Sequence, residues 1–255
     1  MKLVVVADDF GFCKSVNIGI VESHKKGIVT ELSLMLGSPA TDQALGMVKE
    51  QGITNVGIHM LLKNWRDTGA LVRRADYIKL FDELSEADIA KLVEAELQEF
   101  EQVVGHKPSH ITSQFGIAVH IKAISAVIDY ALKHNIPMRQ PVMTLYGDEP
   151  EQNEQSLALM QKRGVRTTDH FIARIMEPDY DKLISLYQQD LLVLKANETA
   201  ELALHPGLAG DDLRAMSSLV DERARDLKLT TDTAFRSWVE SHDIKIVGYG
   251  DIRAS

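Results

Sequence analysis

The sequence predicts an α/β protein built on a parallel sheet, and two observations support this fold class. Short β-rich segments alternate with longer helical segments along the 255 residues, which is typical of repeated β-α-β units. The first β-rich segment, residues 3–7 (LVVVA), is apolar throughout, as a strand buried on both faces is. We expect a deformed, closed or nearly closed (β/α) barrel, with an open doubly wound sheet as the alternative. Either architecture places the active site at the carboxyl ends of the strands.

Cap and turn residues divide the chain into the expected elements. A helix begins near Ser15 and ends at Gly27, since side-chain caps and glycine stops are typical of helix ends. Ser85 and Asp88 resemble a capping box in front of a long helix that meets Gly105. The expected strands are residues 3–7, 28–36, 56–62, 110–115, 136–139, 165–171, 200–204 and 244–249. The expected helices are residues 15–26, 41–51, the segment between Ser85 and Gly105, 121–134, 179–195, 218–227 and 232–241.

One polar segment lacks both periodicities. Residues 140–163 contain Gly147 and two prolines, which predicts a loop or excursion from the fold. Together with residues 63–80 it is expected to supply substrate contacts, because binding residues concentrate on loops. The chain shows neither a linker nor an internal repeat, so we predict a single domain over residues 1–255.

Composition excludes several classes of protein. The chain has 28 Lys and Arg against 37 Asp and Glu, a net charge of -9, so we expect no nucleic-acid partner. Its single cysteine, Cys13, cannot form an internal disulfide, which is typical of a reducing compartment. Apolar runs fall short of the roughly 20 residues that span a membrane, and residues 3–7 are too few for a signal peptide. These features predict a cytoplasmic protein with no membrane partner.

Residues able to do chemistry follow several of the expected strands. Asp8 and Asp9 come directly after the first strand, and His59 lies within the third. Arg139 and His205 end two later strands. Each has an alternative structural role, such as a solvated acidic turn, a buried histidine or a structural ion pair. Because parallel strands end at one rim, we expect these side chains to meet there.

The residue types at this rim indicate metal-assisted hydrolysis. Carboxylate and neutral imidazole are usual ligands of a divalent metal. A late histidine can act as a general acid or base near neutral pH. The sequence contains no phosphate-binding loop, cysteine-based zinc pattern or nucleophile elbow. A metal-dependent barrel aldolase or isomerase is the second possibility.

The chain resembles the YdjC-like carbohydrate deacetylases, a family that includes the chitooligosaccharide (diacetylchitobiose) deacetylases. The resemblance covers nearly the whole chain and is most specific in residues 6–11 (VADDFG). The further matching segments are residues 17–20, 27–30, 57–59 (GIH), 107–110 (KPSH), 136–139 (IPMR), 205–207 (HPG), Arg223 and 246–251. The resemblance implies a deformed barrel of the polysaccharide-deacetylase-like type, which removes the N-acetyl group from a small acetylated sugar or oligosaccharide. It also implies a divalent metal and a homodimer.

Carried over by position, the resemblance implies a role for each strand-end residue. Asp9 and His59 would bind the metal, and Asp8 would be the general base that takes a proton from metal-bound water. His205 would protonate the leaving amine, and Arg139 could hold Asp8 in place.

One position departs from the family pattern. A metal-binding histidine usually stands on the strand after the Lys-Pro-Thr-His segment, and here ungapped counting places Gln114 there. An amide oxygen is a harder ligand than imidazole, so we expect Mg²⁺ rather than Zn²⁺, with Gln114 as the third ligand. The alternatives are that His120 takes its place or that metal binding is lost. The last would make the protein a non-catalytic sugar-binding or regulatory relative.

Overall fold

Parallel strands form the centre of the structure. The computed structural model describes residues 1–63, 65–141 and 150–252. In this part of the chain seven strands form one sheet with the order β4-β3-β2-β1-β6-β5, and β7 also pairs with β1. The strands are β1 (Lys2–Phe10), β2 (Glu31–Leu34), β3 (Val56–Met60), β4 (Ile111–Ser113), β5 (His170–Ile172), β6 (Thr199–Leu204) and β7 (Lys245–Val247). All pairs are parallel, which confirms the predicted fold class.

Strand β1 is the axis of the sheet. One of its edges pairs with β6 from Lys2 to Ala7. Its other edge pairs first with β7, from Lys2 to Val4, and then with β2, from Val6 to Phe10. Because β7 and β2 share one edge in succession, the sheet bends around β1 instead of lying flat.

The curled sheet nearly closes into a barrel through single backbone bonds. Beyond β4, Met138 forms an isolated parallel bridge with Ile111. The Met138 amide then donates to the Arg166 carbonyl at 2.9 Å, and that segment continues into β5. Backbone hydrogen bonds therefore link β4 to β5, as expected for a deformed barrel.

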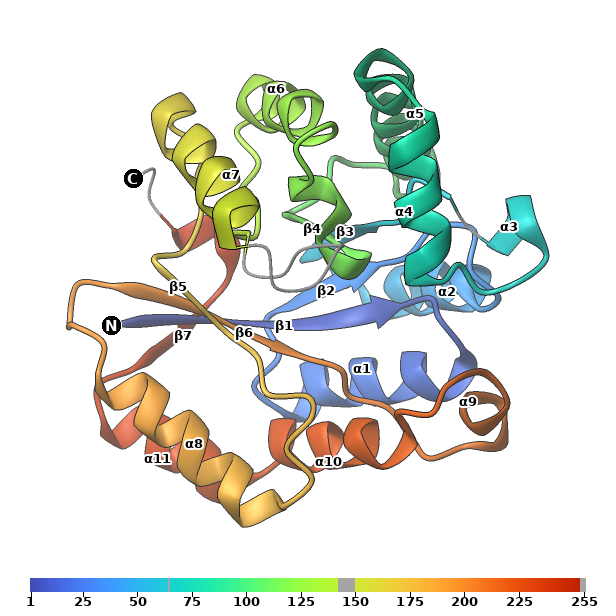
Figure 1. Cartoon of the computed structure of the whole chain (residues 1–255). Helices are drawn as coiled ribbons and strands as arrows, with labels where there is room; N and C mark the ends of the chain where they lie inside the picture. Colours follow the sequence, from blue (N-terminus) through green and yellow to red (C-terminus); the bar gives the residue numbers. More distant parts are fainter. Residues whose placement is uncertain (64, 142–149, 253–255) are drawn as a thin grey trace.

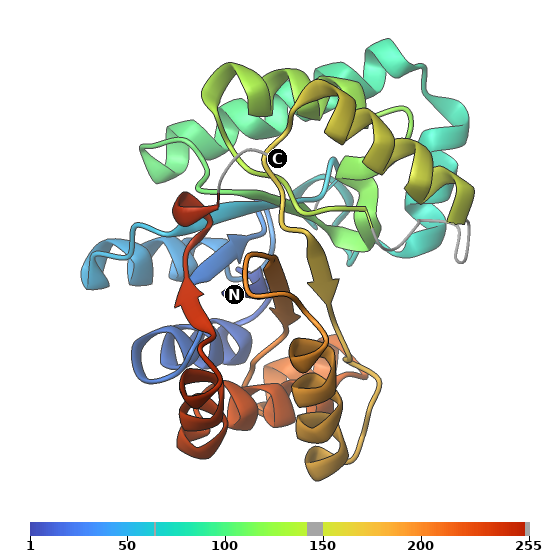
Figure 2. The ribbon, with the colours of Figure 1, turned by 90° about the vertical axis from the view of Figure 1, so that its left-hand side faces the viewer.

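Helices lie on both sides of the strands. In two perpendicular views, α4 to α7 lie together on one side, and α1 lies with α8, α10 and α11 on the other (Figures 1 and 2). The helices are α1 (Lys14–Lys26), α2 (Thr41–Gln51), α3 (Trp65–Thr68), α4 (Arg74–Glu83), α5 (Glu86–Val104), α6 (Ile124–His134), α7 (Pro150–Arg163), α8 (Tyr180–Leu192), α9 (Asp211–Met216), α10 (Val220–Thr230), α11 (Thr233–Ser241) and two 3₁₀ helices, η1 (Gln114–Val119) and η2 (Tyr249–Asp251). Among the described residues, none of the helices combines the length and apolarity needed to cross a lipid bilayer.

Alternation along β1 separates two apolar cores. Leu3, Val5 and Ala7 belong to the large core beneath the helices. Val4 and Val6 instead join a small core with Tyr249 and Ile252. Successive strand residues point to opposite faces, so the second core fills the barrel interior. Asp8 continues the inward-facing series of Val4 and Val6 toward the carboxyl end.

Two predictions about loops and strands were wrong for residues 136–163. Residues 136–139 pair only through the Met138 bridge, because Pro137 has no N–H to donate to a ladder. The polar segment 140–163 contains helix α7, while its residues 142–149 lie outside the described part. Pro150 occupies the first helical position, where its missing N–H costs nothing, and strong helix formers follow.

Other expected boundaries also needed correction. Residues 63–80, predicted as a loop, contain α3 and most of α4, with residue 64 outside the described part. The strand expected at 165–171 is regular only from His170 to Ile172. Helix α1 is capped at Cys13 and not at Ser15. Ser15 lies inside the helix, where its amide donates to Asp212 of α9 at 3.0 Å.

The barrel interior requires glycine at position 57 of β3. A Cβ there would lie 2.3 Å from Nδ1 of His110, whose ring is fully buried and bonds to Ser33. We predict that Gly57→Ala lowers the free energy of unfolding by about 1–3 kcal/mol, because the ring has no free space to move into. Urea unfolding measures this loss. Gly46→Ala in α2 is the matched control, since nothing lies within 4 Å of its Cβ, and it should stabilise the helix by about 0.5–1 kcal/mol. Equal effects of the two substitutions would contradict this explanation.

Candidate active site

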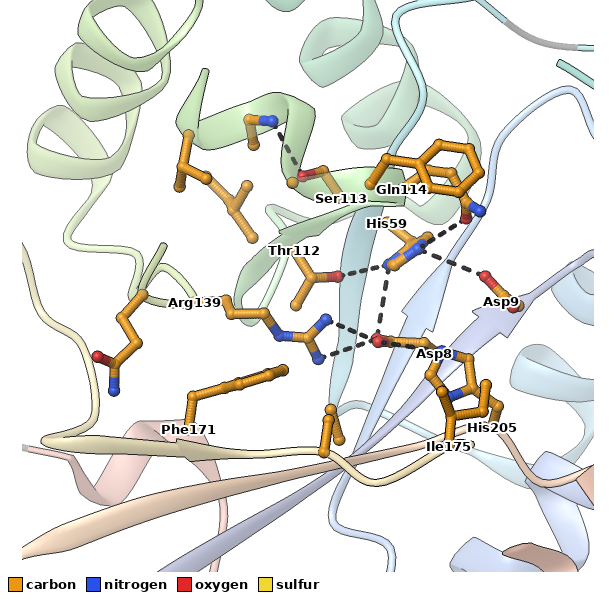
Figure 3. Close-up of a pocket in the computed structure, with 18 of the residues that line it drawn as sticks. Asp8, Asp9, His59, Thr112, Ser113, Gln114, Arg139, Phe171, Ile175 and His205 are labelled. Carbon is orange, nitrogen blue, oxygen red and sulfur yellow. Dashed lines mark hydrogen bonds and ion pairs between the residues drawn. The ribbon is translucent and has the colours of Figure 1, made fainter. Parts of the chain in front are cut away.

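A pocket at the carboxyl ends of the strands brings the predicted site residues together. Its cavity of about 250 Å³ is lined by all six of them (Figure 3). They are Asp8, Asp9, His59, Gln114, Arg139 and His205. The expectation that these distant segments meet at one rim is thus confirmed, whereas none of the described residues between 63 and 80 lines the pocket.

A break in strand β1 lets two adjacent carboxylates face the same cavity. Successive residues of a regular strand point to opposite faces, so Asp8 and Asp9 would normally diverge. Asp9 has φ 68°, in the left-handed region, and the β1–β2 register shifts between Ala7 and Phe10. This bulge turns the Asp9 side chain toward the pocket beside Asp8. Such backbone strain is typical of functional sites.

Asp8 is held by a buried guanidinium. Arg139 Nη1 and Nη2 donate to its two carboxylate oxygens at 2.6 and 3.0 Å. Arg139 Nε also donates to Oε1 of fully buried Glu201 at 2.6 Å, so one cation serves two carboxylates. Burial alone would raise the pKa of Asp8, but Arg139 and, more weakly, His59 and His205 hold this pKa well below its ordinary value. Asp8 is therefore ionised at neutral pH.

Asp9 has its own arginine. Arg223 Nη2, from α10, donates to Asp9 Oδ2 at 2.5 Å, and the guanidinium carbon lies 5.3 Å from the centroid of the Phe12 ring. Burial would raise the pKa of Asp9, but Arg223 and the nearby histidines lower it. The second oxygen, Oδ1, faces His59 Nε2 at 3.4 Å.

The hydrogen bonds of His59 fix its proton. The Thr112 hydroxyl donates to the Ile58 carbonyl at 3.2 Å, so it accepts from His59 Nδ1 at 2.8 Å. Burial lowers the pKa of His59 despite the opposing effect of Asp8 and Asp9, and the ring is neutral at pH 7. With the proton on Nδ1, the lone pair of Nε2 faces the pocket.

Three acceptor atoms, one ring nitrogen and the two oxygens that approach it, lie close together without a proton between them. His59 Nε2 lies 3.4 Å from Asp9 Oδ1 and 3.3 Å from Gln114 Oε1. Clustered lone pairs repel unless a cation lies among them, so this donor set fits a divalent ion. In the described ranges, no group of three or more His, Cys, Asp or Glu could hold a metal, so a cation at this point would need the Gln114 amide as a third donor.

A tight turn presents Gln114 to the pocket. The two residues after it, Phe115 and Gly116, have φ of 51° and 70°, so the chain reverses directly beyond β4. Ser113 closes this turn, since its hydroxyl accepts from the Ala118 amide at 2.9 Å. The alternative ligand, His120, is buried and stacks on Phe81 with ring centroids 3.8 Å apart. It does not line the pocket.

His205 stands across the pocket from the three acceptors. Its Nε2 lies 3.9 Å from Asp8 Oδ2, and its side chain is one-fifth exposed. Its amide donates to Asp226 of α10 at 2.9 Å, and the Gly207 amide donates to the Arg223 carbonyl at 3.1 Å. Helix α10 therefore fixes the loop that carries His205.

Three partners of the site were given no role by the sequence prediction. Glu201 lies two residues before Ala203 and four before His205, on the same inward face of β6 as both, so strand alternation could have found it. Arg223 matches the family pattern, but neither Arg223 nor Asp226 carried a signal for its contacts, because these depend on how α10 packs.

A buried glutamate supports the chain directly after β3. Glu96 of α5 accepts the amides of Leu61 and Leu62, each at 2.7 Å. Burial raises the pKa of Glu96 from 4.5 to about 7, despite these two bonds. The ionised carboxylate is thus costly in the folded protein, although it fixes the segment that follows His59.

This raised pKa predicts how stability depends on pH. Between pH 4.5 and about 7 the folded state binds the Glu96 proton and the unfolded state does not, so this group's contribution is lost as the pH rises. Glu96→Gln has no carboxyl group to ionise at this position. We therefore predict that the unfolding free energy of the variant, relative to that of the wild type, rises by about 3 kcal/mol as the pH increases across this range. Urea unfolding at pH 5 and pH 8 measures the difference. If the difference in unfolding free energy between wild type and variant stays constant across the range, the pKa of Glu96 is not raised in the folded protein.

Comparisons with known proteins match nearly the whole chain to one family. The profile of a family described as YdjC-like protein matches residues 2–241. Proteins named carbohydrate deacetylase include one from Clostridium beijerinckii, 27% identical over 99% of this chain and 100% of that protein. Another, from Brevibacillus brevis, is 26% identical with the same coverage. A crystal structure of an Enterococcus faecalis V583 protein, described as a candidate cellobiose-phosphate cleavage protein, shares the fold with a TM-score of 0.78 and 23% identity, covering 98% of this chain and 97% of that one.

Proposed function

This chain belongs to the YdjC-like family, and on that premise we propose that it is a carbohydrate deacetylase. It hydrolyses the N-acetyl group of an amino sugar or chitooligosaccharide. One observation carries this proposal. A carboxylate that can accept a proton, a histidine that can donate one, and three acceptor atoms suited to a cation all face one pocket. The names of similar proteins support the substrate class.

A divalent cation completes the proposed site. Asp9, His59 and Gln114 would hold it, and their oxygen-rich set favours Mg²⁺ over Zn²⁺. When bound, such a cation lowers the pKa of water and polarises an amide carbonyl. The buried carboxylates of Asp8, Asp9 and Glu201 exceed the arginines that pair with them by one negative charge, which favours its binding.

The protein's own groups move the protons. Asp8 accepts a proton from the attacking water, and Arg139 keeps the carboxylate ionised and correctly oriented. His205 carries a proton on Nε2 to the nitrogen of the sugar amine as the amide C–N bond breaks. Acetate leaves with the oxygen from water, and the free amine remains on the sugar.

The proposed activity is tested by acetate release from diacetylchitobiose and N-acetylglucosamine in the presence of Mg²⁺. We expect turnover that stops on chelation and returns when Mg²⁺ is added. Stoichiometric metal in the purified protein with no acetate from any acetylated sugar would reject the proposal. It would favour a sugar-binding or regulatory relative with a weakened site.

The general-base role predicts the behaviour of Asp8→Asn. This change removes the proton acceptor but leaves the three cation donors in place, so we expect kcat to fall by about 10²–10⁴ with metal content unchanged. Acetate release and metal analysis of the same sample measure both. Full activity in the variant would show that another group accepts the proton.

The amide donor predicts a change in metal preference. Gln114→His replaces a hard oxygen by imidazole and should raise the affinity for Zn²⁺ relative to Mg²⁺ by at least tenfold. Competitive titration of both metals measures the ratio, with Gln140→His as a control on the same pocket rim, outside the donor set. An unchanged ratio in Gln114→His would show that residue 114 does not bind the cation.

A further inference from the structure

The pocket has a charged floor and apolar walls. Its cavity of about 250 Å³ exceeds by far the roughly 30 Å³ that a methyl-sized group or a water molecule occupies. An acetyl group alone therefore leaves most of this space to the rest of the substrate. Its apolar lining includes the large side chains of Phe115, Val119, Met138, Phe171, Ile175 and Leu219.

These apolar residues come from separate segments that meet at the rim. Phe115 and Val119 belong to η1, Met138 lies beside β4, and Phe171 belongs to β5. Ile175 follows β5, and its carbonyl is fixed by a bond of 2.9 Å from the buried guanidinium of Arg225. The apolar wall is thus a built feature of the fold and not a chance exposure of one loop.

The uncharged polar side chains of the walls, Thr112, Ser113 and Gln140, already have protein partners. The Thr112 hydroxyl bonds to Ile58 and His59, and the Ser113 hydroxyl accepts from Ala118. The Gln140 amide donates to the Thr168 carbonyl at 3.2 Å. Sugar hydroxyls placed against these walls would lose water and gain few partners, which is unfavourable. An alkyl group in the same place would lose only its contact with water.

We propose that the sugar carries an apolar group and that this group binds against the wall formed by Phe115, Phe171, Ile175 and Leu219. This inference rests on the proposed deacylation, and it narrows the substrate class from plain sugars to sugars that bear an alkyl group. Two sources have this chemistry: an N-acyl chain longer than acetyl, or an apolar aglycone on the acetylated sugar.

A substrate series separates the two sources. kcat/KM is measured for N-acetylglucosamine, N-hexanoylglucosamine and octyl N-acetylglucosaminide, the last below its micellar concentration. A gain of at least tenfold for the hexanoyl amide assigns the wall to the acyl chain, and the same gain for the octyl glycoside assigns it to the aglycone. If neither apolar substrate exceeds N-acetylglucosamine, the inference is wrong, while the proposed function stands.

A pair of adjacent substitutions tests the wall itself. Ile175→Gln places a polar amide in the wall and should remove most of the preference for the apolar substrate. Met176→Gln is the matched control, because Met176 is 73% exposed and does not line the pocket. The control should keep the preference. If Ile175→Gln keeps the same preference for the apolar substrate as Met176→Gln, the wall is not the source of that preference.

Binding measurements test the apolar wall even if the protein hydrolyses none of these substrates. Affinity is compared by calorimetry for octyl and methyl β-glucoside, and for N-hexanoylglucosamine and N-acetylglucosamine. Tighter binding of an apolar member, lost in Ile175→Gln, would support the wall and reject only the proposed activity. Equal affinities within both pairs would reject the wall.

Discussion

A carboxylate inside a barrel needs a cation beside it, and the site of this protein depends on that constraint. Asp8 and Glu201 are almost fully buried, and Arg139 bonds to both. Asp9 is paired with Arg223 in the same way. Buried ion pairs contribute little net stability, because desolvation offsets most of the attraction. They hold two ionised carboxylates at fixed positions in one pocket, where the proposed proton transfer and cation binding need them.

The constraint extends below the pocket to the C-terminal segment. The Tyr249 hydroxyl donates to Glu201, and its amide donates to Glu31 at 2.8 Å. Its ring stacks on His110, with centroids 5.0 Å apart. The segment after β7 thus satisfies the polar groups in the middle of the barrel, and it fixes the carboxylate that shares Arg139 with Asp8. The pocket and the segment after β7 are therefore joined by one network of hydrogen bonds.

Local patterns predicted the fold class and the strand-end residues, because apolar runs and the residues that follow them are properties of short segments. They predicted that His59 and the acidic pair would meet, and the structure places them 3.4–3.5 Å apart. They could not predict the bulge at Asp9, which depends on a register shift against β2. Nor could they predict the bonds of Arg223 and Asp226, since these depend on how α10 packs.

Helix α7 was missed because most of its residues are polar and few are buried. The expected cytoplasmic location and homodimer stay predictions.

The central claim is that Asp9, His59 and Gln114 converge to hold a divalent cation beside Asp8. Anomalous diffraction from crystals of the protein grown with Mn²⁺, a hard cation with its own scattering signal, tests it most directly. We expect one peak within bonding distance of Asp9 Oδ1, His59 Nε2 and Gln114 Oε1. An empty position between these atoms in crystals that release acetate, or a peak on other residues, would contradict it.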